Sequence, residues 1–231
     1  MDLKIVVVID NRTYVKGLKS DWGLSIYVEG FGKKVLFDTD TNPFYLKENA
    51  DKLGIKFSDL DAIIISHDHY DHTGGLSIIS KSKKGIDVYI PSRASKRLYS
   101  LIEELGLNPV PISETTQIFE NYFVIGELPA GFLWEIALAI RTRKGLVILL
   151  GCSHPGGDNL VEKAMNDIGD NVYIIIGGLH SPSIHTLDRL IEFDPYKIYP
   201  IHCSGSRAVE YIKEKAPEKL GIGGSGLVIE I

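Results

Sequence analysis

Residues 61–75 read DAIIISHDHYDHTGG, a short apolar run that ends in a dense group of histidines and aspartates. Positions 67–72 hold three of the chain's seven histidines and two aspartates. The β-branched residues of AIII predict a buried strand. At ordinary compositions an H-x-H-x-D-H string arises by chance in roughly one chain per thousand or fewer. The pattern therefore indicates a functional site at the end of a core strand.

Three further histidines occupy the same kind of position. His154 follows LVILLGCS, His180 follows VYIIIGGL, and His202 follows YKIYPI. A lone histidine beside a strand is usually a satisfied polar group, but six at strand ends are hard to explain in that way. The seventh, His185, falls at the start of a predicted helix, where we expect it to be solvated.

Imidazole and carboxylate groups at this spacing predict metal binding. They are the ligands that zinc, iron and manganese take when no cysteine cluster is available. His67 and His69 lie two apart in an extended segment, so they project to the same side and can bind one ion together. Asp71 and His72 belong to the turn that follows and suit a neighbouring ion. We expect one or two divalent ions, with zinc favoured over manganese, iron or magnesium.

Size and charge narrow the function further. The 231 residues fit a single domain, 1–231, with a large core. A net charge of −5 argues against a nucleic-acid partner, because phosphate binding requires a basic face. The apolar runs are far too short to span a membrane, and the first ten residues, MDLKIVVVID, lack the basic region of a secretory signal. We expect a cytoplasmic protein that acts on a small molecule, with no nucleic-acid or membrane partner and with its oligomeric state open.

Short strand-like runs alternate with helical ones along the whole chain. The patterns predict strands over 3–9, 24–29, 33–38, 61–66, 86–90, 122–128, 135–142, 146–150, 172–176, 196–201 and 226–231. They predict helices over 42–54, 91–106, 159–169, 185–193 and 206–216. Strands dominate the start of each half, and strand–helix alternation dominates its end. This order predicts an α+β protein with two sheets packed face to face and helices outside.

The motifs resemble those of a known superfamily. SHDHYDHTGG resembles the signature of the metallo-β-lactamase fold superfamily, and LSIYVEG, KKVLFDTD, GCSHPGG and YPIHCSG extend the resemblance from about residue 3 to 231. DN near the start, DWGLS, GCSHPG, GGLH and PIHCSG are similar to a branch of these metal-dependent hydrolases described as dihydropterin synthase-like. The resemblance implies a four-layer αββα sandwich with metals between the edges of the two sheets.

The resemblance also implies the ligands. It assigns one ion to His67, His69 and His154, and a second ion to Asp71, His72 and His202. Most members add an aspartate that bridges both ions, whereas the matching strand end here offers His180, with Cys152 as a rival. Apart from this possible ligand role of Cys152, both cysteines, Cys152 and Cys203, are expected to be small buried residues. Asp40 stands where related turns carry glycine, which makes the local backbone uncertain.

The missing carboxylate has an expected consequence. A neutral His180 does not offset the repulsion between two dications, so we expect a second site that is weaker than the first. His180 is then a ligand, or a catalytic residue close to the ions. On this interpretation His180→Asp raises the metal content per chain.

The expected chemistry is hydrolysis of a small, anionic ester, lactone or phosphate compound by a metal-activated water. Asp71 could accept its proton, and Tyr70, inside the motif, could stabilise an oxyanion or simply pack. Ser204 and Arg207 lie where a small-residue turn opens into a helix, a setting that suits a substrate anion or an ordinary helix cap. A second basic cluster, PSRASKRL at 91–98, is explained equally well as a solvated helix face.

Two enzyme classes remain open. The first is a metal-dependent hydrolase. The second, implied by the branch resemblance, is a transferase that joins a dihydropterin diphosphate to an aminobenzene ribose phosphate. A nuclease fits the acidic chain poorly, a structural metal site would be richer in cysteine, and a diiron redox protein would bring a flavin module.

Overall fold

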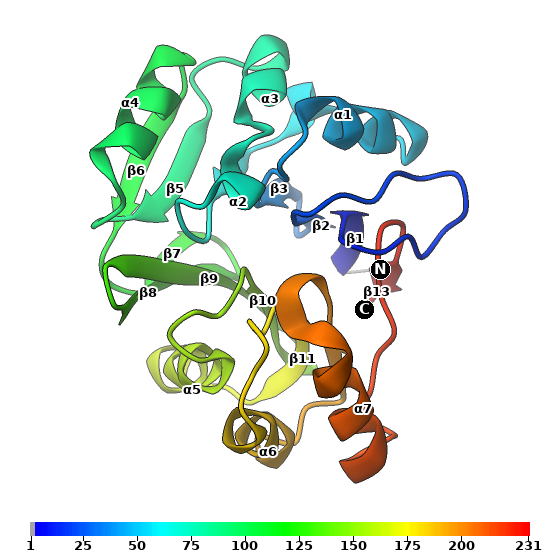
Figure 1. Cartoon of the computed structure of the whole chain (residues 1–231). Coiled ribbons are helices and arrows are strands. Elements are labelled where there is room, and N and C mark those ends of the chain that lie inside the picture. The colour runs from blue at the N-terminus through cyan, green and yellow to red at the C-terminus, as the bar shows by residue number, and fades with distance from the viewer. Residues whose placement is uncertain (1–2) are drawn as a thin grey trace.

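Two β-sheets lie face to face between two layers of helices (Figure 1). The computed structural model describes residues 3–231. The first sheet has seven strands in the spatial order β13 (Val228–Glu230), β1 (Leu3–Ile9), β2 (Ser25–Gly30), β3 (Lys33–Phe37), β4 (Ala62–Ile64), β5 (Asp87–Pro91) and β6 (Asn108–Ile112). The second has six, in the order β12 (Lys197–Pro200), β11 (Val172–Gly177), β10 (Gly145–Leu150), β9 (Leu133–Thr142), β8 (Tyr122–Ala130) and β7 (Thr116–Phe119).

Helices cover the outer face of each sheet (Figure 1). The first sheet carries α1 (Pro43–Lys52), α3 (Leu76–Ser82) and α4 (Lys96–Glu104), and the second carries α5 (Gly157–Ile168), α6 (Ile184–Glu192) and α7 (Gly205–Lys215). The short α2 (Tyr70–Thr73) and the 3-10 turns at Phe57–Asp59 and His202–Ser204 complete the list. This arrangement confirms the predicted α+β class and the four-layer αββα sandwich.

Three apolar layers hold the sandwich together. Fully buried side chains such as Phe37 and Leu138 fill the space between the sheets. Leu46 and Ile102 belong to the layer beneath the helices of the first sheet, and Leu190 belongs to the layer beneath those of the second. Burying one such side chain contributes about 1.5–3 kcal/mol. No helix within residues 3–231 is long and apolar enough to cross a membrane.

The observed elements differ from the predicted ones at two sheet edges, at one helix start and in the helices α2 and α3, which were not among the predicted ranges. β6 is a strand with the sequence NPVPI, which its two prolines concealed; proline is tolerated there because β6 is an edge strand. β7, at the edge of the other sheet, was also not expected. The helix predicted over 91–106 begins at Lys96, because Pro91 ends β5 and Ser95 accepts a hydrogen bond from the Leu98 N–H (3.3 Å) as the cap.

The topology brings the histidine-bearing loops together. Strands β10, β11 and β12 are parallel neighbours, so the loops that follow them leave the same edge of the second sheet. In the first sheet, β4 runs parallel to β3 and β5 and leads into the histidine motif. Gly177 at the end of β11 has φ 144°, and a Cβ there would lie 2.0 Å from the Leu150 carbonyl oxygen, so only glycine allows this close approach.

Candidate metal centre

Three histidines from two loops form a first group of donor atoms. The ligand atoms of His67, His69 and His154 all lie within 4.8 Å of one another. Nε2 of His67 is 3.0 Å from Nδ1 of His69, and the His154 ring centroid lies 4.9 and 5.0 Å from those of the two other rings. Nε2 of His154 is buried and has no hydrogen-bond partner within residues 3–231. A cation is the partner that such convergent nitrogen atoms fit.

Hydrogen bonds beneath the first group fix the tautomer of His67. The Ser66 hydroxyl donates to Oδ2 of Asp38 (2.7 Å) and lies 2.9 Å from Nδ1 of His67. That hydroxyl therefore accepts from Nδ1–H, which leaves the lone pair of Nε2 facing the group. Burial and the neighbouring histidines hold the pKa of His67 well below its usual range. The imidazole is thus neutral, as a metal ligand must be.

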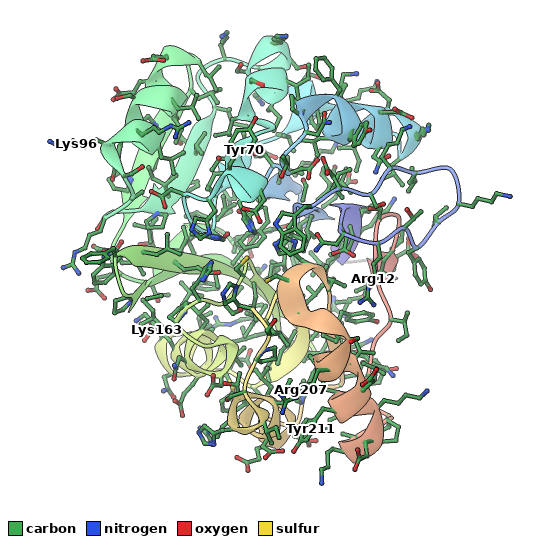
Figure 2. The ribbon with its side chains drawn as sticks, viewed as in Figure 1. Arg12, Tyr70, Lys96, Lys163, Arg207 and Tyr211 are labelled. Atoms are coloured by element: carbon green, nitrogen blue, oxygen red, sulfur yellow. The ribbon has the colours of Figure 1, made fainter. Side chains whose placement is uncertain are left out.

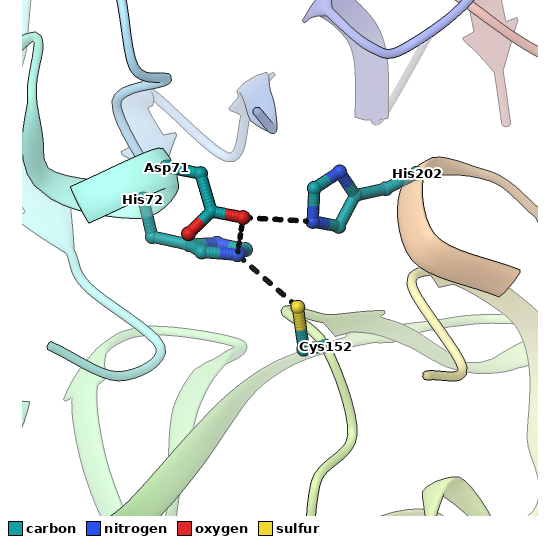
Figure 3. A group of neighbouring side chains, drawn as sticks. All are labelled: Asp71, His72, Cys152 and His202. Carbon is teal, nitrogen blue, oxygen red and sulfur yellow. Dashed lines mark hydrogen bonds and ion pairs between the residues drawn. The ribbon is translucent and has the colours of Figure 1, made fainter. Parts of the chain in front are cut away.

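A second group contains two histidines, an aspartate and a cysteine (Figure 3). Nε2 of His72 lies 3.3 Å from Sγ of Cys152 and 3.6 Å from Oδ2 of Asp71. The same Asp71 oxygen lies 3.5 Å from Nε2 of His202, which is buried and has no hydrogen-bond partner in the described part of the chain. A sulfur beside two imidazoles and a carboxylate favours zinc over magnesium or manganese.

Each histidine of the second group is oriented by a hydrogen bond at Nδ1, the ring nitrogen that faces away from the group. Nδ1 of His72 bonds to Oδ2 of Asp38 at 2.6 Å, and Nδ1 of His202 bonds to Oδ1 of Asn11 at 2.9 Å. Both bonds leave Nε2 turned into the group. Hydrogen-bonded carboxylates and amides of this kind fix the direction of a metal ligand and raise its basicity.

The charges of the second group suit a cation. Burial alone would lower the pKa of His72, but the adjacent Asp38 carboxylate outweighs it and raises the pKa to about 9. Burial likewise raises the pKa of Asp71, but the His202 and His72 imidazoles beside its carboxylate bring it down to about 2. An ion that binds here displaces a proton from His72. Asp71 therefore stays ionised, as a carboxylate ligand must be.

A buried glutamate on β9 shapes the loop that carries donors of both groups. Oε1 of Glu135 accepts from the N–H groups of Cys152 and Ser153 (both 2.8 Å), and Oε2 accepts from the N–H of His154 (2.7 Å). Burial raises the pKa of Glu135 to about 7. The sequence interpretation did not include Glu135 or Asp38, although a charged residue inside or ending an apolar strand (EIALAI, VLFD) was the available signal.

Left-handed backbone is concentrated around the centre. Non-glycine residues with positive φ include Asp38 (58°), Asp40 (60°), Ser153 (65°), His180 (47°) and His202 (54°). Such conformations are costly and tend to occur at functional sites. Asp40 keeps the conformation that favours glycine, which resolves the uncertainty about this turn.

The two residues considered for the missing ligand lie in overlapping groups of possible metal ligands. Cys152 joins the second group, and it also forms a third group with His180 and Cys203, whose ligand atoms likewise lie within 4.8 Å of one another. His180 is exposed, and its ring centroid lies 4.2 Å from that of His154. Cys152 is buried and Cys203 is half-buried, and both are free thiols. A hydrogen bond with Cys152 lowers the pKa of Cys203.

The three residues expected to bind substrate lie in different surroundings. Tyr70 is 62% exposed and lines a cavity that also borders His69. Ser204 is buried; its hydroxyl accepts from the Leu179 N–H (3.0 Å) and donates to the Ile201 carbonyl (2.7 Å), so both of its bonds are made inside the fold. Arg207 is exposed on α7, and Figure 2 shows it in the other half of the molecule from Tyr70.

Comparisons with known proteins show what the chain and its fold are similar to. Residues 33–126 match the family described as the β-lactamase superfamily domain. The 7,8-dihydropterin-6-methyl-4-(β-D-ribofuranosyl)-aminobenzene-5′-phosphate synthase of Methanocaldococcus jannaschii is 30% identical over 90% of this chain and 90% of its own. The crystal structure of Tm1679, a metal-dependent hydrolase of the β-lactamase superfamily, is 26% identical and covers 99% of both chains with a TM-score of 0.82. Zn²⁺-bound PqqB from Methylobacterium extorquens shares the fold at 11% identity, with a TM-score of 0.65 over 99% of this chain and 100% of its own.

Proposed function

This chain belongs to the metallo-β-lactamase superfamily, and on that basis we propose that it is a metal-dependent synthase that joins a dihydropterin diphosphate to an aminobenzene ribose phosphate. The observation that carries the proposal is the 30% identity to the synthase over 90% of both chains. Both substrates are small molecules, so the proposal does not require the basic face that a nucleic-acid partner would need.

The two groups of donor atoms support this proposal. His67, His69 and His154 would hold one ion, and Asp71, His72, Cys152 and His202 would hold the other. When bound, the ions would supply positive charge that stabilises a diphosphate leaving group. The protein itself holds these donors in place through Asp38, Asn11 and Glu135.

The proposed reaction balances without a further reactant. The bond between the dihydropterin methylene carbon and the diphosphate oxygen breaks, and its electron pair leaves with diphosphate. The nitrogen of the aromatic amine bonds to that carbon and loses one proton. We assign the proton to His180, because it is an exposed imidazole beside His154.

The test is amine-dependent release of diphosphate. Zinc-loaded protein is mixed with (7,8-dihydropterin-6-yl)methyl diphosphate, with and without 4-(β-D-ribofuranosyl)aminobenzene 5′-phosphate. The proposal predicts diphosphate release and a coupled product, identified by mass, only when both substrates are present. Release at the same rate without the amine would contradict it, and metal-stripped protein serves as the control.

A hydrolase is the second candidate. The likeness to Tm1679, 26% identical over 99% of both chains, favours it. In that case the same centre would cleave a small anionic ester, lactone or phosphate compound with water. Turnover of such a compound by zinc-loaded protein, without any aromatic amine, would select this candidate over the synthase.

A further inference from the structure

A cavity of about 280 Å³ borders the first group of donor atoms, and the proposed chemistry leaves it unassigned. It lies between α2, which follows His69, and the first turns of α4. The lining residues that matter here are His69, Tyr70, Ser95, Arg97, Leu98 and Leu101. Its position beside a candidate metal ligand makes it suitable for the part of a substrate that extends away from the reacting atoms.

One wall of the cavity is apolar and aromatic. Leu98 is buried, Leu101 is half-buried, and both come from α4. The Tyr70 ring from α2 is 62% exposed, although it lies between two of the candidate metal ligands in the sequence. Aliphatic and aromatic side chains of this kind pack well against a planar ring.

The polar part of the lining carries an available cation. Arg97 is exposed and makes no hydrogen bond or ion pair within residues 3–231. Asp68 is a carboxylate in the same lining, and its Oδ2 accepts a hydrogen bond from the N–H of Ser95, another lining residue (2.9 Å). A guanidinium group presents paired N–H donors that match phosphate oxygens. The lining of the cavity therefore suits a ligand that combines an aromatic ring with a phosphate group.

We propose that this cavity holds the phosphorylated aromatic amine, with its ring against Tyr70, Leu98 and Leu101 and its phosphate on Arg97. The assignment rests on the proposed function, which requires a site for a second substrate next to the metal centre. It also leaves the centre itself for the diphosphate of the other substrate.

Binding of the amine alone tests the assignment. Calorimetry with zinc-loaded protein and 4-(β-D-ribofuranosyl)aminobenzene 5′-phosphate should show about tenfold weaker binding for Arg97→Gln, the loss of one charge-assisted contact. Lys96→Gln is the matched control: Lys96 is on the same turn, does not line the cavity, and points away from the molecule (Figure 2). The unphosphorylated amine should bind the wild type and Arg97→Gln equally.

The outcomes separate this inference from the proposed function. An equal effect of the Arg97 and Lys96 substitutions, or no binding by the wild type, would overturn the cavity assignment. In the synthase assay, Arg97→Gln should raise the KM for the amine about tenfold and leave the KM for the diphosphate substrate unchanged. If Arg97-dependent binding is found without any coupled product, the assignment stands and the proposed synthase reaction falls.

Discussion

Nδ1 of His72 lies 2.6 Å from Oδ2 of Asp38, and both side chains are fully buried. The same carboxylate accepts from the Ser66 hydroxyl, which in turn bonds to Nδ1 of His67. One buried carboxylate therefore orients a histidine in each group of donor atoms. The two halves of the candidate centre share this support.

Removing the Asp38 charge should weaken the second group first. In Asp38→Asn the amide keeps the shape but loses the charge that holds His72. We expect the zinc affinity of the second group to fall about 10- to 100-fold, the usual effect of losing such a supporting group. Elemental analysis after dialysis measures it, and urea unfolding of the metal-free variant shows whether the fold is kept. A folded variant with wild-type zinc content would contradict the role given to Asp38.

Cys152 should be a ligand and Cys203 should not. Cys152→Ser replaces sulfur with a hydroxyl that binds zinc poorly, whereas Cys203→Ser leaves the second group intact. In cobalt-substituted protein we expect the sulfur-to-cobalt charge-transfer absorption to vanish in Cys152→Ser and to persist in Cys203→Ser. The reverse pattern would assign the ligand to Cys203.

Zinc binding to the second group should depend on pH. In the metal-free protein the pKa of His72 is about 9, so its Nε2 carries a proton at neutral pH. That proton must leave before zinc binds, so on this account affinity should rise by nearly tenfold per pH unit from about pH 7 and level off above about pH 9. Calorimetry in buffers of different ionisation enthalpy would count the protons released. A zinc affinity that is constant over this range would show that zinc binding does not displace a proton from His72.

The same ion pair should affect the stability of the metal-free protein. The folded-state pKa of His72, about 9, exceeds its ordinary value of 6.5. The stabilisation is therefore complete below pH 6.5 and is lost as the pH rises through 9, by up to about 3 kcal/mol. Urea unfolding across this range should show a decline in the wild type that is smaller in Asp38→Asn. Parallel declines would mean that other groups titrate instead.

His180 should matter for rate and not for metal content. His180 shares a third group of possible ligands with Cys152 and Cys203, but it belongs to neither of the two groups to which we assign zinc. We therefore expect neither His180→Asn nor the His180→Asp change considered from the sequence to alter zinc content. Loss of a proton acceptor would lower kcat of the synthase reaction about 100-fold. A joint loss of zinc and activity in His180→Asn would instead make His180 a ligand.

The sequence predicted the histidines of the two groups from short motifs. The spacing of His67 and His69, and the positions of His154 and His202 at the ends of predicted strands, placed them in the candidate site, where the structure brings their side chains together. The supporting carboxylate of Glu135 was not predicted, because its partners lie 17 to 19 residues away and depend on how the loop after β10 folds.

Two other features depended on the tertiary structure. The sequence left Cys152 and His180 as alternatives, and only the folded loops show that Cys152 lies with Asp71, His72 and His202 while His180 lies with Cys152 and Cys203. The strand β6 was not predicted, because proline lowers strand propensity. An edge strand tolerates proline, but the sequence does not reveal which strand lies at an edge. The sequence explains Arg97 equally well as part of a solvated helix face, and only the structure places it in the lining of the cavity beside His69.

The most direct measurement is anomalous diffraction at the zinc absorption edge from crystals of zinc-loaded protein. The geometry predicts one peak among His67, His69 and His154, and a second among Asp71, His72, Cys152 and His202. Crystals grown with excess zinc that show no peak at either position would contradict the existence of the metal centre.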